Sequence, residues 1–249
     1  MYLFKNVHHM KNYVEIIFVN AFINIKTELI NFIVNFISIL FYIVIFATIL
    51  NKQVNNYLQF LLPGLIIINI LSAISYQGLK IWSLGSTSKL MTYWLSLPYS
   101  IEFQLLSFSS MAVFNAFLYT FPLILIGMYL GITFDIESWV IIIFLSSLLL
   151  FFIIMSFVLY MFKTNSFIIV FNVSQPLLLR ISPIFYPLIY LPLFALPLSF
   201  INPITWMVQS LRGQFNILLS IIVLVFLDII SYKLLTRYWK KKLKLGDLI

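Results

Sequence analysis

Six runs of apolar residues, separated by short polar breaks, constrain this chain more than any other feature of its sequence. Most of them reach the roughly 20 helical residues that cross the hydrocarbon core of a bilayer. Hydrophobic residues make up 63% of the 249 positions and charged residues 9%, whereas a soluble domain is roughly half apolar and about a quarter charged. The sequence therefore predicts an all-α membrane protein, a single transmembrane domain over residues 1–249. The six predicted transmembrane helices cover residues 29–50, 57–81, 103–130, 139–162, 167–181 and 215–235.

The basic residues predict how these helices are oriented. If six spans alternate in direction, twelve of the fifteen lysines and arginines fall on one side of the membrane, and only Lys52, Arg180 and Arg212 fall on the other. Basic residues mark the cytoplasmic side. We therefore expect a multi-pass protein of the cell membrane with both termini in the cytoplasm. The net charge of +8 is then a topology signal and a contact with anionic lipid, and nucleic acid is not expected as a partner.

The residues before the first predicted span show an amphipathic pattern that continues into that span. Within residues 1–28, polar and apolar residues alternate at helical spacing, which predicts an amphipathic helix in the cytoplasmic interface. The polar stripe continues into the first span as Asn31 and Asn35. Amides in hydrocarbon need partners, so this face is expected to contact protein or water. A helix-packing seam and the lining of a transport path are both open. Residues 236–249 are expected to form a basic cytoplasmic tail after the spans at 29–235.

The inventory of reactive residues argues against an enzyme. The chain has no cysteine, its two histidines are the adjacent His8 and His9, and its seven acids are scattered singly. No glycine begins the phosphate-binding loop GxxxxGK[ST], whose backbone amides cradle nucleotide phosphates. The sequence predicts no catalytic residue, no metal site and no cofactor bound by this chain.

Two of the charged residues in the predicted spans are candidates for a role in transport. Asp228 falls inside the sixth run, where an acid is costly and usually partnered; Tyr232 and Lys233 are the near candidates. Structural pairing and a role in transport both stay open for it. Arg180 precedes the proline-rich stretch, where it either donates to carbonyls that the prolines leave unpaired or binds an anionic head group. The candidate residues of a transport path are Asn31, Asn35, Arg180 and Asp228.

A proline-rich apolar stretch follows the fifth run. Six of the nine prolines lie between Pro176 and Pro203. Proline breaks helices, and hydrocarbon tolerates no unsatisfied irregular backbone. We therefore expect residues 181–212 to form short helical pieces that begin and end outside the cell, an extracellular re-entrant segment that serves as an outer gate. The gate residues are predicted to be Pro183, Phe185, Tyr186, Pro187, Tyr190, Asn202 and Pro203.

These motifs resemble the membrane subunit of type-2 ABC exporters. The stretch SPIFYPLIYLP, followed by INPITWMVQSLR, is similar to a segment of that family in which Asn-Pro precedes a helix ending in Arg, here Asn202, Pro203 and Arg212. KLMTYWLSLP, residues 89–98, is similar to the family's cytoplasmic loop between spans two and three, which contains the coupling helix. Where the family commonly has an acid ahead of this loop, this chain has Thr87.

The resemblance implies the membrane permease subunit of an ATP-driven exporter. Two such permease subunits, identical or different, would work with two ABC ATP-binding subunits that bind ATP and Mg. The cargo would be amphipathic or hydrophobic: a lipid, a glycolipid or polysaccharide, or a drug-like molecule. A secondary carrier or channel is the alternative, and an integral membrane enzyme is a weaker one. The residues expected to contact the ATPase are Leu90, Met91, Tyr93, Trp94, Leu95 and Pro98.

Overall fold

The computed structural model describes residues 25–47, 57–87, 101–160 and 166–244, and the regular structure of these residues is helical throughout. Six long helices dominate: α2 (Ile25–Tyr42), which the π-helical turn η1 (Ile43–Ala47) extends, α4 (Tyr57–Thr87), α6 (Ile101–Tyr129), α7 (Ile136–Tyr160), α8 (Ser166–Ile181) and α11 (Ile217–Lys244). Three short helices lie between the last two: the 3-10 helix η2 (Leu188–Tyr190), α9 (Leu196–Ile201) and α10 (Pro203–Leu211).

Four of the long helices are apolar enough and long enough to cross a membrane. The apolar stretches within the described ranges are Tyr57–Leu79, Leu105–Tyr129, Ile136–Tyr160 and Ile217–Lys240. They coincide with the second, third, fourth and sixth predicted spans. The prediction of an all-α membrane protein is confirmed to that extent. Helix α11 continues to Lys244, so most of the expected basic tail is helical.

The first and fifth predicted spans are occupied by shorter helices. Helix α2 has 18 residues and α8 has 16, and neither contains an apolar stretch as long as those of the other four helices. Both helices lie where the sequence predicts them, but their crossing of the membrane stays a prediction.

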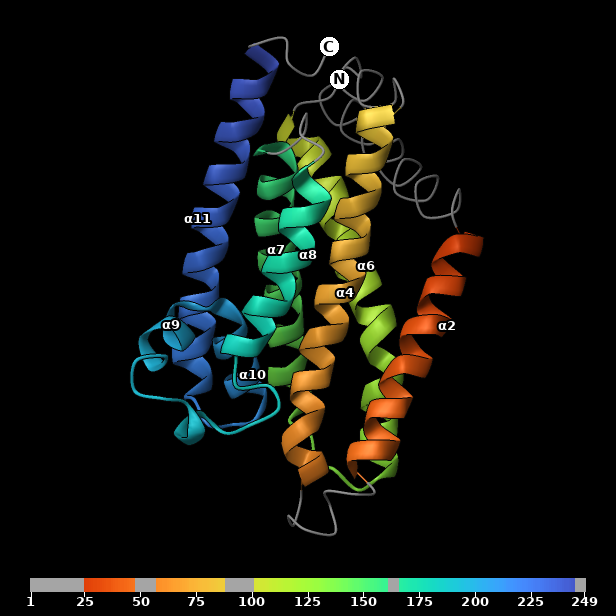
Figure 1. Ribbon diagram of the computed structural model, residues 1–249, viewed down its shortest axis with the longest axis vertical. Coiled ribbons are helices and arrows are strands. Elements are labelled where there is room, and N and C mark those ends of the chain that lie inside the picture. Colours follow the sequence, from red (N-terminus) through yellow and green to blue (C-terminus); the bar gives the residue numbers. More distant parts are fainter. Residues whose placement is uncertain (1–24, 48–56, 88–100, 161–165, 245–249) are drawn as a thin grey trace, which may run out of the picture.

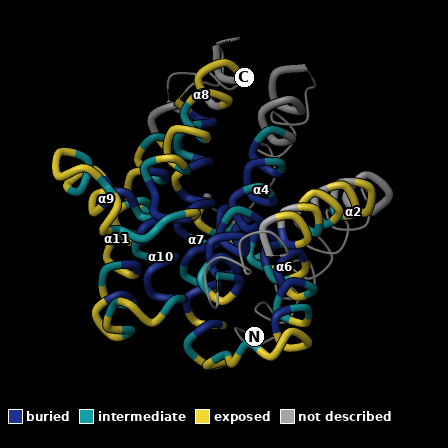
Figure 2. The backbone as a smooth tube through the Cα atoms, turned by 60° about the horizontal axis from the view of Figure 1, so that its bottom comes forward, coloured by how far each residue is buried: buried dark blue, intermediate teal, exposed yellow. Residues whose placement is uncertain are grey.

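The long helices run side by side with alternating direction (Figure 1). Helices α4, α7 and α11 begin at the lower end in that view, whereas α6 and α8 begin at the upper end. Helix α4 is the most enclosed: 78% of its most apolar stretch is buried, against 17% for α11. Figure 2 shows that α2 lies on the outside with most of its described residues exposed, whereas the described residues of α4 are mostly buried. The core therefore consists mainly of side chains from α4, α6 and α7.

Gly78 allows α4 and α7 to approach closely. A Cβ atom added at Gly78 of α4 would lie 2.5 Å from Cγ2 of Ile154 in α7, too close for two carbon atoms. In α4, the buried Ile67, Ile70 and Ile74 continue the packed surface toward the other end. Without hydrophobic attraction between helices inside lipid, such close van der Waals packing is a main source of bundle stability.

Gly78→Val is expected to destabilise the bundle. The new side chain has to displace Ile154 or separate α4 from α7, and overpacking of this kind costs about 1–3 kcal/mol. Val140→Leu is the matched control, because it adds bulk to α7 at a side chain that is 45% exposed. Thermal unfolding in detergent, followed by circular dichroism, should show a lower midpoint for Gly78→Val alone. Equal midpoints for both variants and the wild type would contradict the tight packing of α4 on α7.

Candidate functional site

The proline-rich stretch between α8 and α11 folds back beside the bundle. In Figure 1, α9 and α10 lie next to the lower part of α11, and the lower end of α4 extends further down than α9 does. Pro197 and Pro203 stand in the first turn of α9 and α10, where a missing N–H is harmless and a fixed φ favours the helix. The prediction of short helical pieces is confirmed. Whether the segment re-enters the membrane stays a prediction.

Asn202 connects the start of α10 to the end of α8. Its side-chain oxygen accepts a hydrogen bond from the backbone N–H of Ile204 at 3.1 Å and so caps α10. Its Nδ2 donates to the carbonyl of Leu178 at 2.9 Å and to Oγ of Ser182 at 2.8 Å. The buried Asn202 therefore fastens the start of α10 to the end of α8, with its donors and its acceptor used at once.

Arg212 fastens the same segment to α4. It ends α10 and precedes Gly213, whose φ of 67° turns the chain toward α11. The guanidinium donates from Nε to the carbonyl of Phe60 at 2.9 Å, from Nη1 to that of Pro183, and from Nη2 to that of Ile184 at 2.5 Å. Its Cζ lies 3.5 Å from the centre of the Phe60 ring. One side chain thus holds carbonyls from two parts of the chain that are more than 100 residues apart.

Two tyrosines donate hydrogen bonds to further backbone carbonyls of the proline-rich stretch. Tyr57 donates from its hydroxyl to the carbonyl of Phe185 at 3.2 Å, and Tyr186 donates to that of Arg180. The carbonyl-binding role considered for Arg180 falls to Arg212 instead. Arg180 has an exposed side chain, and among the described residues only its backbone is engaged. The sequence signal for Arg212 was available, since it is an arginine at the end of a helix that starts with Asn-Pro.

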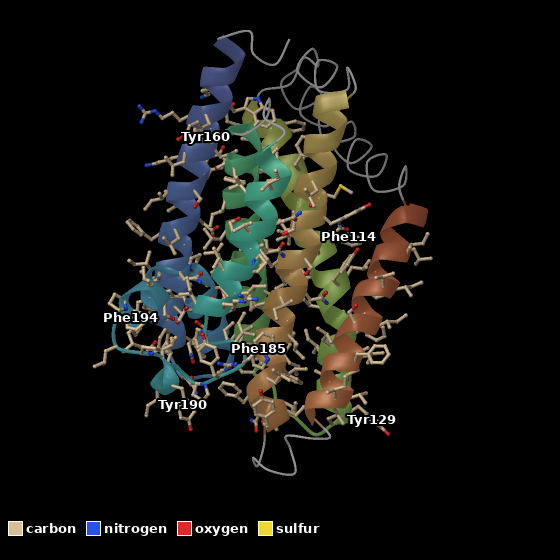
Figure 3. All side chains as sticks on the ribbon, viewed as in Figure 1. Phe114, Tyr129, Tyr160, Phe185, Tyr190 and Phe194 are labelled. Carbon is tan, nitrogen blue, oxygen red and sulfur yellow. The ribbon has the colours of Figure 1, made fainter. Side chains whose placement is uncertain are left out.

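The predicted gate residues do not converge on one cavity. Pro183 and Asn202 are buried, Tyr186, Pro187 and Pro203 are half-buried, and Phe185 and Tyr190 are exposed. Figure 3 shows Tyr190 and Phe194 on the outer side of the segment, away from α4. Their exposed fractions are 76% and 80%. The buried members of the set hold the segment in place, and the exposed members form an apolar surface.

A cavity of about 390 Å³ lies at this end of the bundle. It is bounded by the first turns of α4 and α7, the connection between α6 and α7, and the turn between α10 and α11. The sequence alone does not reveal it, because three stretches of the chain that are far apart in sequence meet there. The residues around it are Gln59, Phe60, Pro63, Ile132, Thr133, Asp135, Ser138, Trp139, Ser210, Leu211, Arg212, Gly213, Gln214 and Ile217.

Arg212 is the basic residue among those that line the cavity. Burial lowers the pKa of Arg212 to about 9, so the group still carries its charge at neutral pH. Asp135 borders the same cavity, but its Oδ2 accepts a hydrogen bond from Oγ of Ser138 at 2.5 Å, and within the described ranges it forms no ion pair with Arg212. The cavity is therefore bordered by two charges that do not pair with each other, the carboxylate of Asp135 at the start of α7 and an arginine whose partners are neutral carbonyls.

Asp228 lies in the middle of α11 and is 8% exposed. Neither of its carboxylate oxygens has a hydrogen-bond partner among the residues described, and neither does the buried Oγ of Ser146 in α7. The expected pairing with Tyr232 or Lys233 is not formed. An ion pair of 2.9 Å joins Lys240 of α11 to Glu102 at the start of α6, near the opposite end from the cavity. Asp228 is thus a buried acid with unused oxygens.

The remaining predicted sites lie outside the described residues. Residues 88–100, which include the expected ATPase contact, are among them, and so are the side chains of Asn31 and Asn35 in α2. Asn31, Asn35, Arg180 and Asp228 stay candidates for a transport path.

Comparison with known proteins assigns no family to this chain. A scan of protein-family models finds no match, and a search of curated proteins finds none either. The function proposed below therefore rests on the residues, their geometry and the resemblance in the two motifs.

Asn202→Asp is expected to loosen the proline-rich segment. The carboxylate keeps the cap of α10 but loses both donated hydrogen bonds and faces the carbonyl of Leu178, which costs about 1–3 kcal/mol for a buried group. Asn216→Asp is the matched control. Asn216 caps α11 only by accepting hydrogen bonds, from the backbone N–H groups of Leu218 and Leu219, so an acid there is tolerated. Hydrogen exchange of residues 182–201 should accelerate in the first variant alone, and equal exchange in both would remove the bridging role of Asn202.

Proposed function

We propose that this chain is the membrane permease subunit of an ATP-driven ABC exporter that moves an amphipathic or hydrophobic cargo out of the cytoplasm or the inner leaflet. One observation carries the proposal: a bundle of apolar helices whose last two long members are connected by a proline-broken segment, folded back along the bundle and fastened through Asn202 and Arg212. These two residues belong to the motif that resembles type-2 ABC exporters.

The proposal assigns the energy source to a partner. Active transport needs a motor, and the sequence contains no phosphate-binding loop. An ABC ATPase subunit, which binds ATP and Mg, would dock at residues 89–98. That stretch directly follows the end of α4 at Thr87, and it combines aromatic and apolar residues with few charges, as is typical of a protein contact.

The proposal also implies a dimer in the membrane. Six spans of this composition contain too few polar residues to enclose a wide aqueous path. The outward face of α2 is apolar, with Ile33, Val34 and Phe41 exposed, which suits lipid or a second subunit equally. The amides of Asn31 and Asn35 on the same helix favour protein or water. We therefore expect a second permease subunit, identical or different, beside α2.

A secondary carrier is the second candidate, and Asp228 is the observation that favours it. A buried intramembrane acid with unused oxygens is a common feature of proton-driven transport. The two functions differ in their energy source. Uptake into inside-out vesicles that requires ATP and an ABC ATPase supports the exporter, whereas uptake driven by a proton gradient alone supports the carrier.

Trp94→Glu is expected to release the ATPase subunit. A carboxylate in the centre of an apolar contact loses its hydration without gaining a partner, which costs about 1–3 kcal/mol or more. Tyr190→Glu makes the same kind of change at an exposed side chain near the opposite end of the bundle and is the control. Affinity purification from membranes should recover the ATPase with the wild type and with Tyr190→Glu, but not with Trp94→Glu. Equal recovery with all three would contradict docking at residues 89–98.

Tyr186→Ala is expected to make the proposed outer gate leak. It removes an aromatic ring from the segment together with the hydroxyl that binds the carbonyl of Arg180. Tyr186→Phe is the matched control, because it removes the hydroxyl and keeps the ring that excludes water. Dye release from proteoliposomes without ATP should rise for Tyr186→Ala well above Tyr186→Phe. If neither variant leaks, and the complexes of both with the ATPase subunit turn over ATP at the wild-type rate, the segment is a structural plug.

A further inference from the structure

We propose that the cavity beside Arg212 is a binding site for a phosphate group, and that its natural source is the head group of a membrane phospholipid. The site needs only that this end of the bundle lies at a membrane surface. It does not depend on the chain being an exporter, and it holds for either orientation in the membrane.

The first argument is the uncompensated charge of Arg212. Its three protein partners are the carbonyls of Phe60, Pro183 and Ile184, which accept hydrogen bonds but carry no negative charge. No carboxylate among the described residues lies within ion-pair distance of it. A largely buried cation is costly unless an anion accompanies it. Guanidinium also has five N–H donors, so two remain for a ligand after the three carbonyls are bound.

The second argument is that the guanidinium is fixed in place. It stacks at 3.5 Å over the ring of Phe60, and the two carbonyls that hold its Nη atoms come from adjacent residues. A long side chain normally loses rotamer freedom when it binds a ligand, and here that freedom is already lost. Pre-organisation of this kind raises affinity, and a planar fork of donors suits the oxygens of a phosphate.

The third argument is the field around the cavity. Helices α4, α7 and α11 all begin at its edge: Gln59 and Phe60 lie in the first turn of α4, Trp139 in that of α7, and Ile217 starts α11. The N-terminus of a helix carries partial positive charge and favours anions. One acid, Asp135, also borders the cavity and carries the opposite charge, and it accepts a hydrogen bond from Ser138 in the first turn of α7. Because Asp135 lies at the start of α7 and forms no ion pair with Arg212 within the described residues, it offsets the partial charge of that helix, and Arg212 together with the starts of α4 and α11 favours an anion.

The fourth argument is depth and size. Three of the four apolar stretches that can cross a membrane begin next to the cavity, at Tyr57, Ile136 and Ile217. The cavity therefore lies where hydrocarbon gives way to head groups, and the abundant anion at that depth is the lipid phosphodiester. Its volume of about 390 Å³ exceeds that of one phosphate and leaves room for the glycerol or alcohol attached to it. Gln59, Thr133 and Gln214 offer donors to that polar part.

The test is a binding titration on the purified full-length chain in detergent. The probes are a short-chain phosphatidylglycerol, inorganic phosphate, and the diacylglycerol that has the same chains without the phosphate, with native mass spectrometry as the readout. Arg212→Gln removes the cation, and Thr133→Trp fills the cavity while leaving the three hydrogen bonds of Arg212 intact. Arg237→Gln is the matched control, since it removes one exposed arginine from α11, roughly 30 Å along the helix from Ile217 at 1.5 Å per residue.

Phosphatidylglycerol is expected to bind the wild type and Arg237→Gln equally, and to bind the two cavity variants at least about tenfold more weakly, as the loss of hydrogen bonds to a charged group requires. Inorganic phosphate that displaces the lipid at equal concentration would support the phosphate site and identify a soluble anion as its source. Unchanged lipid affinity in Thr133→Trp, or equal binding of the diacylglycerol, would overturn the proposal. Thr133→Trp keeps the test decisive even if Arg212→Gln does not fold.

Discussion

Backbone carbonyls without helical partners are the constraint on which this structure depends. The prolines after α8 stop a helix in apolar surroundings, and each buried carbonyl left unpaired would cost about 1–3 kcal/mol. Side chains supply the donors: Arg212 for Pro183 and Ile184, Tyr57 for Phe185, and Tyr186 for Arg180. The break is therefore tolerated only because α10 returns across the end of the bundle and because α4 starts there.

The long helices could be predicted from the sequence, because the thickness of the bilayer sets their length. The apolar runs at 57–81, 103–130, 139–162 and 215–235 correspond to α4, α6, α7 and α11. The prolines likewise predicted the short helices of 181–212. The Asn-Pro motif marked Arg212, but the carbonyls that Arg212 reaches could not be predicted, because Arg180 is close to them in sequence whereas Arg212 is close only in space. Its position depends on the turn at Gly213 and on the path of α10, which no local pattern encodes.

Two uncompensated charges of opposite sign distinguish the described part of the bundle. Arg212 lies at one end, bound to neutral carbonyls, and Asp228 lies within α11 with both oxygens unpartnered. Structural needs explain the first charge only in part, since a neutral donor would also serve a carbonyl, and they do not explain the second. Charges kept in apolar surroundings commonly mark ligand or ion sites. The two candidate sites are chemically opposite, one suited to an anion and the other to a proton or cation.

Helix α4 connects the two ends of the molecule at which the proposed exporter would act. Its first turn is bound to Arg212, and a Cβ at Gly64 would lie 2.7 Å from Ile184 of the proline-rich segment. Its last residue, Thr87, directly precedes the stretch expected to contact the ATPase. A continuous helix of 31 residues is roughly 46 Å long at 1.5 Å per residue. Because packed helices move as units and not by continuous deformation, a displacement of residues 89–98 would be transmitted along α4 to Phe60 and Arg212. The same hydrogen bonds that satisfy the proline break would then couple residues 89–98 to the proline-rich segment.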